Sequence, residues 1–79
     1  MILIDARGLR HPDHINAFRA EFAGLCGVYQ DVEILIDDLA DERRKLEMFL
    51  RSCRARYTVE KIPEGHVKVI VEQPFYMCG

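Results

Sequence analysis

The sequence predicts a two-layer α/β sandwich, in which two helices pack on one face of a four-stranded mixed sheet. Short apolar segments that suit strands alternate with segments whose apolar residues recur at helical spacing, in the order β-α-β-α-β-β. Strand–helix–strand crossovers are right-handed, so both helices are expected on the same side of the sheet. The chain has 79 residues, of which 49% are hydrophobic, and this suffices for one small domain with a packed core.

The first half of the chain supplies a strand, a turn and a helix. Residues 1–5 are apolar and β-branched, as expected of a buried strand. Residues 6–11 indicate a tight turn, and a helix is expected to begin at Pro12, because proline is tolerated in the first turn of a helix. This helix is expected to end near Leu25 or Cys26, where two glycines flank the chain. Its apolar positions, three or four residues apart, are Ile15, Phe18, Phe22 and Leu25.

The second half supplies a strand, a helix and a hairpin. Residues 31–38 are apolar on both faces at their centre, which favours an interior strand. Asp38 is expected to cap a helix over residues 39–53. Residues 56–62 and 66–72 alternate as strands and are joined by a Pro-Glu-Gly turn. The core-facing stripe expected of the helix is Leu46, Phe49, Leu50 and Cys53.

Composition narrows the classes of protein to which the chain can belong. A net charge of −2 argues against a surface built for nucleic acid or anionic lipid. No apolar run approaches the roughly 20 residues of a membrane span, and the N-terminus lacks the pattern of a signal peptide. Three cysteines without a CxxC pair fit reduced thiols. We therefore expect a cytoplasmic protein with one domain over residues 1–72 and a short C-terminal tail over 73–79.

The turn before the first helix, RGLRHPDH, holds the candidate binding residues. Backbone N–H groups point outward at a helix N-terminus and the helix dipole is positive there, so the position before Pro12 suits a thiolate or a bound anion. In this chain that position is His11. The candidate partner- or ligand-binding residues are Arg7, Gly8, Arg10, His11, Pro12, Asp13 and His14.

This layout resembles the TusA (SirA-like) sulfur-carrier family. The matching residues are Asp5, Gly8, Leu9 and Pro12 after the first strand, and Ile36, Asp37 and Asp38 after the second, together with the length and the element order. The resemblance implies transfer of persulfide sulfur between partner proteins by the cysteine of a Cys-Pro-x-Pro motif at the start of the first helix. Here His11 stands at the cysteine position and His14 at the second proline position, and imidazole cannot carry a persulfide.

Three functions are compatible with these residues. The first, our working hypothesis, is an adaptor that keeps the docking surface of the family and acts by protein–protein contact in or beside sulfur transfer. The second is a persulfide carrier that uses another cysteine, for which Cys78 is the most accessible candidate, since Cys26 and Cys53 are expected to be structural. The third is a metal- or small-ligand-binding module that uses His11 and His14.

The sequence does not predict an enzyme or a bound cofactor. Two histidines do not complete a zinc site, which takes three or four protein ligands, so no metal is assigned. No nucleophile–base pair or phosphate-binding loop is present in the sequence. The second helix carries a run of basic residues without interleaved aromatic residues, and this pattern favours an acidic protein over single-stranded RNA. The predicted partner is therefore a protein of the sulfur-relay type.

Overall fold

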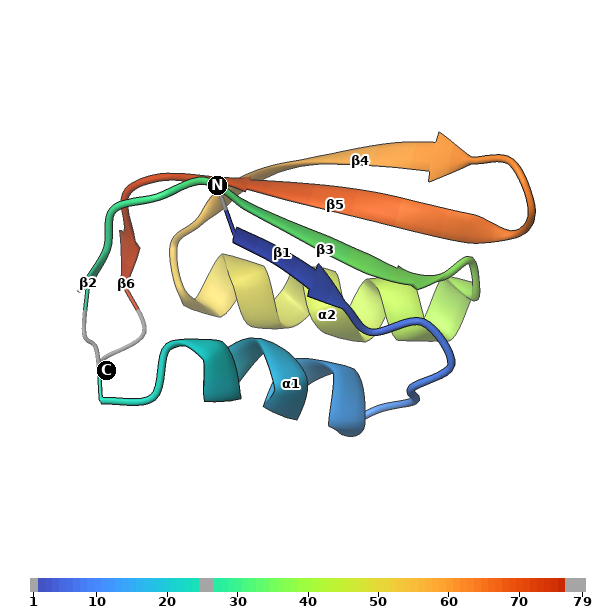
Figure 1. The fold of residues 1–79 in the computed structure, drawn as a ribbon, viewed down its shortest axis with the longest axis horizontal. Coiled ribbons are helices and arrows are strands. Elements are labelled where there is room, and N and C mark those ends of the chain that lie inside the picture. The colour runs from blue at the N-terminus through green and yellow to red at the C-terminus, as the bar shows by residue number, and fades with distance from the viewer. Residues whose placement is uncertain (1, 25–26, 77–79) are drawn as a thin grey trace.

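The computed structural model describes residues 2–24 and 27–76. Figure 1 shows two layers, with a four-stranded sheet on one side and two helices on the other. The strand order is β1-β3-β5-β4; β1 runs parallel to β3, and the other neighbours are antiparallel. The predicted sandwich is confirmed. The elements are β1 (Ile2–Asp5), α1 (Asp13–Glu21), β2 (Gly27–Val28), β3 (Val32–Asp37), α2 (Ala40–Ser52), β4 (Arg56–Ile62), β5 (His66–Glu72) and β6 (Phe75–Tyr76).

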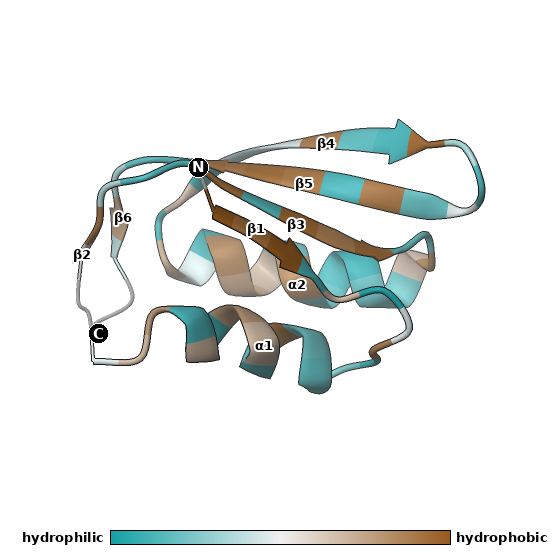
Figure 2. Cartoon of the chain, viewed as in Figure 1, coloured by the Kyte–Doolittle hydropathy of each residue, from teal (hydrophilic) through white to brown (hydrophobic). Residues whose placement is uncertain are grey.

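The core lies between the two layers. Every second residue of β3 and β5 is buried, because successive side chains of a strand point to opposite faces and the helices cover only one of them. Figure 2 shows the same alternation as brown and teal bands along β5. Phe18 of α1, and Leu46 and Leu50 of α2, are fully buried against these strands. Each such side chain stabilises the fold by about 1.5–3 kcal/mol. The predicted apolar stripe of α2 is therefore confirmed.

Strand β1 differs from the buried strand that the sequence predicts. It lies at the edge of the sheet, and only Ile4 of its four residues is buried. Leu3 is 61% exposed, because it points to the sheet face that no helix covers. An apolar run alone does not distinguish an edge strand from a central one. β3 does lie inside the sheet as predicted, although helices cover only one of its faces.

Each helix begins one residue after its predicted start. Pro12 is the N-cap of α1 rather than its first residue, and Leu39 caps α2 in place of Asp38. The Asp38 carboxylate instead lies 3.5 Å from Arg43 of the same helix. α1 also ends earlier than predicted, since Phe22 is its C-cap. The predicted end at residues 25–26 lies outside the described residues.

A second, two-stranded sheet was not predicted. In β2 and β6, Gly27 pairs with Tyr76 and Val28 pairs with Phe75. Phe75 is fully buried, and its ring centroid lies 5.9 Å from that of Phe18 and 5.8 Å from that of Phe22. The first part of the segment that the sequence assigns to a tail thus packs against the core. Neither helix of the described residues is long and apolar enough to cross a membrane.

Candidate functional site

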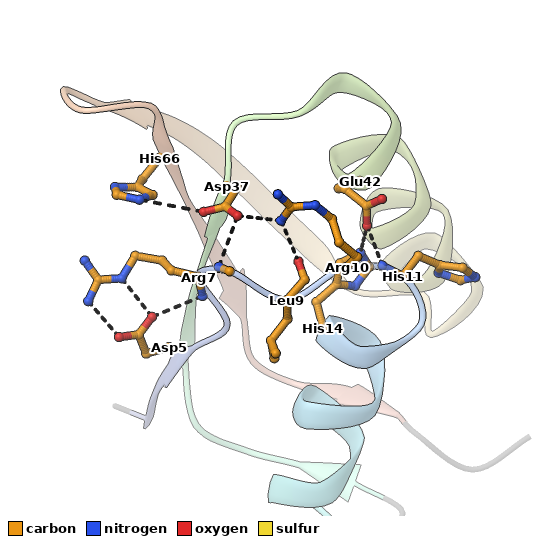
Figure 3. A network of polar contacts seen from close by, with 10 residues as sticks. Asp5, Arg7, Leu9, Arg10, His11, His14, Asp37, Glu42 and His66 are labelled. Carbon is orange, nitrogen blue, oxygen red and sulfur yellow. Dashed lines mark hydrogen bonds and ion pairs between the residues drawn. The ribbon is translucent and has the colours of Figure 1, made fainter.

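The turn formed by residues 7–13, which we call the 7–13 turn, lies at one end of the molecule. It follows β1 and leads into α1. Because β1 and β3 are parallel neighbours, their carboxyl ends lie at the same edge of the sheet, and the start of α2 is brought to the same place. Figure 3 shows that carboxylates from β3 and α2 reach this turn, and that His66 of β5 lies against the carboxylate from β3.

Asp37, the last residue of β3, fixes the first half of the turn. Its Oδ2 accepts hydrogen bonds from the Gly8 N–H at 3.0 Å and from the Arg10 guanidinium at 2.6 Å (Figure 3). The same Arg10 nitrogen donates to the carbonyl oxygen of Leu9 at 3.2 Å. The hydrogen bond from Arg10 holds the pKa of Asp37 below its ordinary value. Gly8 has a φ of +84°, which a glycine adopts without strain.

Glu42, in the first turn of α2, fixes the second half. Its Oε2 accepts a hydrogen bond from the His11 N–H at 2.6 Å and lies 2.8 Å from Nε2 of His14 (Figure 3). The His14 side chain is fully buried, and that of Glu42 is 13% exposed. Burial raises the pKa of Glu42, but the hydrogen bonds from His11 and His14 outweigh burial and leave this pKa below its ordinary value. The pair thus joins the start of α1 to the start of α2.

At the N-terminus of α1, the backbone N–H groups of His11, Asp13 and His14 donate hydrogen bonds to other groups of the protein. The N–H groups of Asp13 and His14 both point to the carbonyl oxygen of Arg10, at 2.6 and 3.4 Å. His11 lies one residue outside the N-cap, and its N–H donates to Glu42. A carboxylate from α2 therefore lies at the position where the sequence suggests a thiolate or a bound anion. This arrangement stabilises the helix end, because a negative charge is favourable there.

Apart from Leu9, which packs against the core, the side chains of the 7–13 turn are exposed, whereas hydrogen bonds hold the backbone at Gly8 and His11. Six of the seven candidate residues are exposed, namely Arg7, Gly8, Arg10, His11, Pro12 and Asp13. Arg7 forms a two-point ion pair with Asp5, at 2.8 and 2.7 Å, which lowers the pKa of Asp5 to about 2. His14, the seventh candidate residue, is buried and is not part of the exposed surface. Its ring contacts Glu42, which in turn accepts the hydrogen bond from the His11 N–H.

The rings of His11 and His14 are neighbours, and one ring nitrogen of His14 is paired with a carboxylate. The ring centroids of His11 and His14 lie 5.8 Å apart, but Nε2 of His14 is engaged by Glu42. Nδ1 of His14 is buried and has no hydrogen-bond partner among the described residues. Within residues 2–24 and 27–76, no group of three or more His, Cys, Asp or Glu residues could hold a metal ion. His14 is thus a buried residue whose Nε2 is paired with Glu42.

The one cysteine that the structure describes lies far from the 7–13 turn. Cys53 caps the carboxyl end of α2, about three helical turns from Glu42. It is buried as predicted, and burial raises the pKa of its thiol, which disfavours a nucleophilic thiolate. The candidate sulfur carrier Cys78, and Cys26, lie outside the described residues. At the carboxyl end of α2, Arg51 donates to the Tyr57 hydroxyl.

Comparison with known proteins supports the fold that the sequence suggests. No protein-family model matches the chain, and no curated protein is significantly similar to it. Among solved structures, it is similar to a SirA-like protein from Desulfitobacterium hafniense, with a TM-score of 0.73 over 90% of this chain and 95% of that chain. The two sequences are 22% identical over this match. The chain is thus a small α/β protein with the fold of a SirA-like protein, as the resemblance in its sequence implies.

Sequence reasoning identified the exposed residues of the site but missed the two carboxylates that hold them. From the sequence, Asp37 is named only as part of a motif and Glu42 is not singled out. The signal for Asp37 was its place near the end of the strand expected over residues 31–38. No comparable signal existed for Glu42, because its contact with His14 depends on the packing of α1 against α2.

The position of the Glu42 carboxylate allows a prediction of how a cysteine introduced at position 11 would react. In His11→Cys, the new thiol would lie close to the Glu42 carboxylate, which accepts a hydrogen bond from the backbone N–H of the same residue. A nearby negative charge disfavours a thiolate. We therefore expect His11→Cys to react with iodoacetamide at a higher pH than His11→Cys/Glu42→Gln, in which the amide oxygen still accepts hydrogen bonds. Equal pH profiles for the two variants would show that Glu42 does not act on this position.

Proposed function

We propose that this chain is a TusA-like protein of altered chemistry, which acts by protein–protein contact in or beside sulfur transfer. The contact surface is the 7–13 turn. The observation that carries the proposal is that two carboxylates, Asp37 and Glu42, hold the turn backbone while all its side chains except that of Leu9 are exposed. A surface that is already ordered loses less conformational entropy when a partner binds.

The chemistry of the site supports contact rather than catalysis at position 11. A histidine stands where the resemblance implies a sulfur-carrying cysteine, and the Glu42 carboxylate lies beside its backbone N–H. An incoming persulfide is an anion and would be repelled by this carboxylate. The proposed partner is a protein of a cytoplasmic sulfur relay. This partner would bind the exposed side chains of Arg10, His11 and Pro12.

The proposal is tested by binding to a cysteine desulfurase, measured by calorimetry with purified proteins. His11→Asp changes the charge of an exposed side chain that makes no side-chain hydrogen bond with the described residues. We expect it to weaken binding at least about tenfold, which corresponds to about 1.4 kcal/mol. Thr58→Asp, on the exposed far edge of the sheet, is the matched control and should bind as the native protein does.

Two results would oppose the proposal. Binding that is unchanged in His11→Asp, or lost equally in Thr58→Asp, would separate the contact from the 7–13 turn. A gain of one sulfur atom in intact mass after incubation with cysteine and the desulfurase, abolished by Cys78→Ser, would instead identify a persulfide carrier. Melting curves of both aspartate variants show whether either change acts through unfolding.

A further inference from the structure

The outer edge of β1 has unpaired backbone groups. The Ile2 N–H donates to the carbonyl oxygen of Asp31 at 3.0 Å, and the Ala6 N–H donates to that of Leu35 at 2.8 Å. Successive residues of a strand direct their N–H and C=O groups to opposite sides. Leu3 and Asp5 therefore direct theirs away from β3. β1 is the first strand of the sheet, so no other strand of the described residues receives these groups.

Most of this edge is apolar. Three of the four residues of β1, Ile2, Leu3 and Ile4, have neither charge nor a proline ring, the fourth is the exposed Asp5, and Leu3 is 61% exposed. Exposed apolar edges of this kind pair readily with another strand. The opposite edge, β4, is protected, since it carries Arg56, Glu60 and Lys61, and Lys61 lies opposite the buried Val67 on the helix side of the sheet. The two edges of the sheet thus differ in their capacity to add a strand.

We propose that the free edge of β1 pairs with the same edge of a second copy of this chain. The strands would run antiparallel, with Leu3 on the two-fold axis and Ile2 opposite Ile4. The two Leu3 residues would then exchange two N–H···O=C hydrogen bonds, because both backbone groups of Leu3 face outward. The pairing joins two four-stranded sheets into one of eight strands.

The self-pairing is favoured because this register is complementary to itself on both faces. Leu3 meets Leu3 on the open face of the sheet, and Ile2 meets Ile4 on the helix-covered face, so the central cross-strand contacts are apolar. A two-fold interface requires one patch to match itself in this way. The nearest charge, on Asp5, is already paired with Arg7 and adds no net repulsion. The inference is independent of the proposed function, because the paired segment consists of Ile2, Leu3 and Ile4, none of which belongs to the 7–13 turn.

A cysteine placed on the proposed axis tests the pairing. In a background of Cys26→Ser and Cys78→Ser, Leu3→Cys would bring two thiols together across the axis. The Cα–Cα separation of a hydrogen-bonded antiparallel pair, about 5.5 Å, suits a disulfide. With diamide as oxidant, two thiols become one disulfide and diamide is reduced to its hydrazine form. We expect a covalent dimer that forms at least about tenfold faster than in Thr58→Cys, an exposed control on the opposite edge.

The native chain provides a second measurement. Sedimentation equilibrium is expected to show reversible dimers of the native protein and monomers of Leu3→Lys, with a melting curve that shows Leu3→Lys to be folded. A native chain that stays monomeric at high concentration would overturn the proposal. So would Leu3→Cys that cross-links no faster than Thr58→Cys. After either result, the alternative occupant of the β1 edge would be an extended segment of a different protein.

Discussion

His14→Ala is expected to destabilise the domain by about 2–4 kcal/mol, since it creates a cavity and leaves the Glu42 carboxylate without its buried partner. The imidazole is fully buried and lies 2.8 Å from Glu42. Urea unfolding followed by circular dichroism measures the loss. Asn16→Ala, at an exposed position of the same helix, is the control and should change stability by less than about 0.5 kcal/mol. A similar, small effect of both changes would contradict the structural role assigned to His14.

The same pair makes stability depend on pH in a defined direction. The pKa of Glu42 is lower in the folded protein than its ordinary value of 4.5, so the unfolded chain binds more protons near that pH. The contribution of Glu42 is therefore complete above pH 4.5 and is lost as the pH falls through the folded pKa. Glu42→Gln does not titrate and should show a shallower loss of stability on acidification than the native protein. An unchanged slope would contradict this account.

Phe75→Ala is expected to destabilise the domain by about 3–5 kcal/mol, because it removes a large buried aromatic side chain. The ring is fully buried and packs edge-on against Phe22, with Phe18 on another side. Tyr76→Ala is the matched control, since Tyr76 belongs to the same short strand and is 51% exposed. Urea unfolding of both variants would show a large loss for Phe75 and a small one for Tyr76.

This prediction tests whether the β2–β6 sheet is part of the folded domain. A loss of less than about 1 kcal/mol for Phe75→Ala would mean that the aromatic cluster is not closed by this residue in solution. A full loss would show that a chain ending at residue 72 lacks part of its core. The sequence-based division into a domain and a tail would then place its boundary too early.

Much of the fold could be predicted from local pattern. The helix stripe of Leu46 and Leu50 and the alternation of Val67, Val69 and Val71 follow from the repeats of helix and strand, which are properties of the backbone itself. The exposed residues of the site were also predictable, because a Gly-Leu step followed by His-Pro indicates a turn wherever it occurs. In each case the signal lies within a few residues of the feature that it predicts.

Contacts between distant residues could not be predicted in this way. The position of β1 at the edge of the sheet, the pairing of β2 with β6 and the burial of Phe75 depend on which segments meet in space. Single-sequence patterns contain no direct information on such pairings, since the same apolar run suits an edge strand or a central one.

The sequence by itself determined the order of the two helices and of the four strands of the main sheet, their apolar faces and the presence of a histidine at position 11. Only the tertiary structure decided that His14 is buried, that Glu42 supplies the negative charge at the start of α1 and that Asp37 holds the preceding turn. The physical reason is that each carboxylate acts across 27 to 31 residues of chain, from an element whose place is set by the packing of the sheet and the two helices.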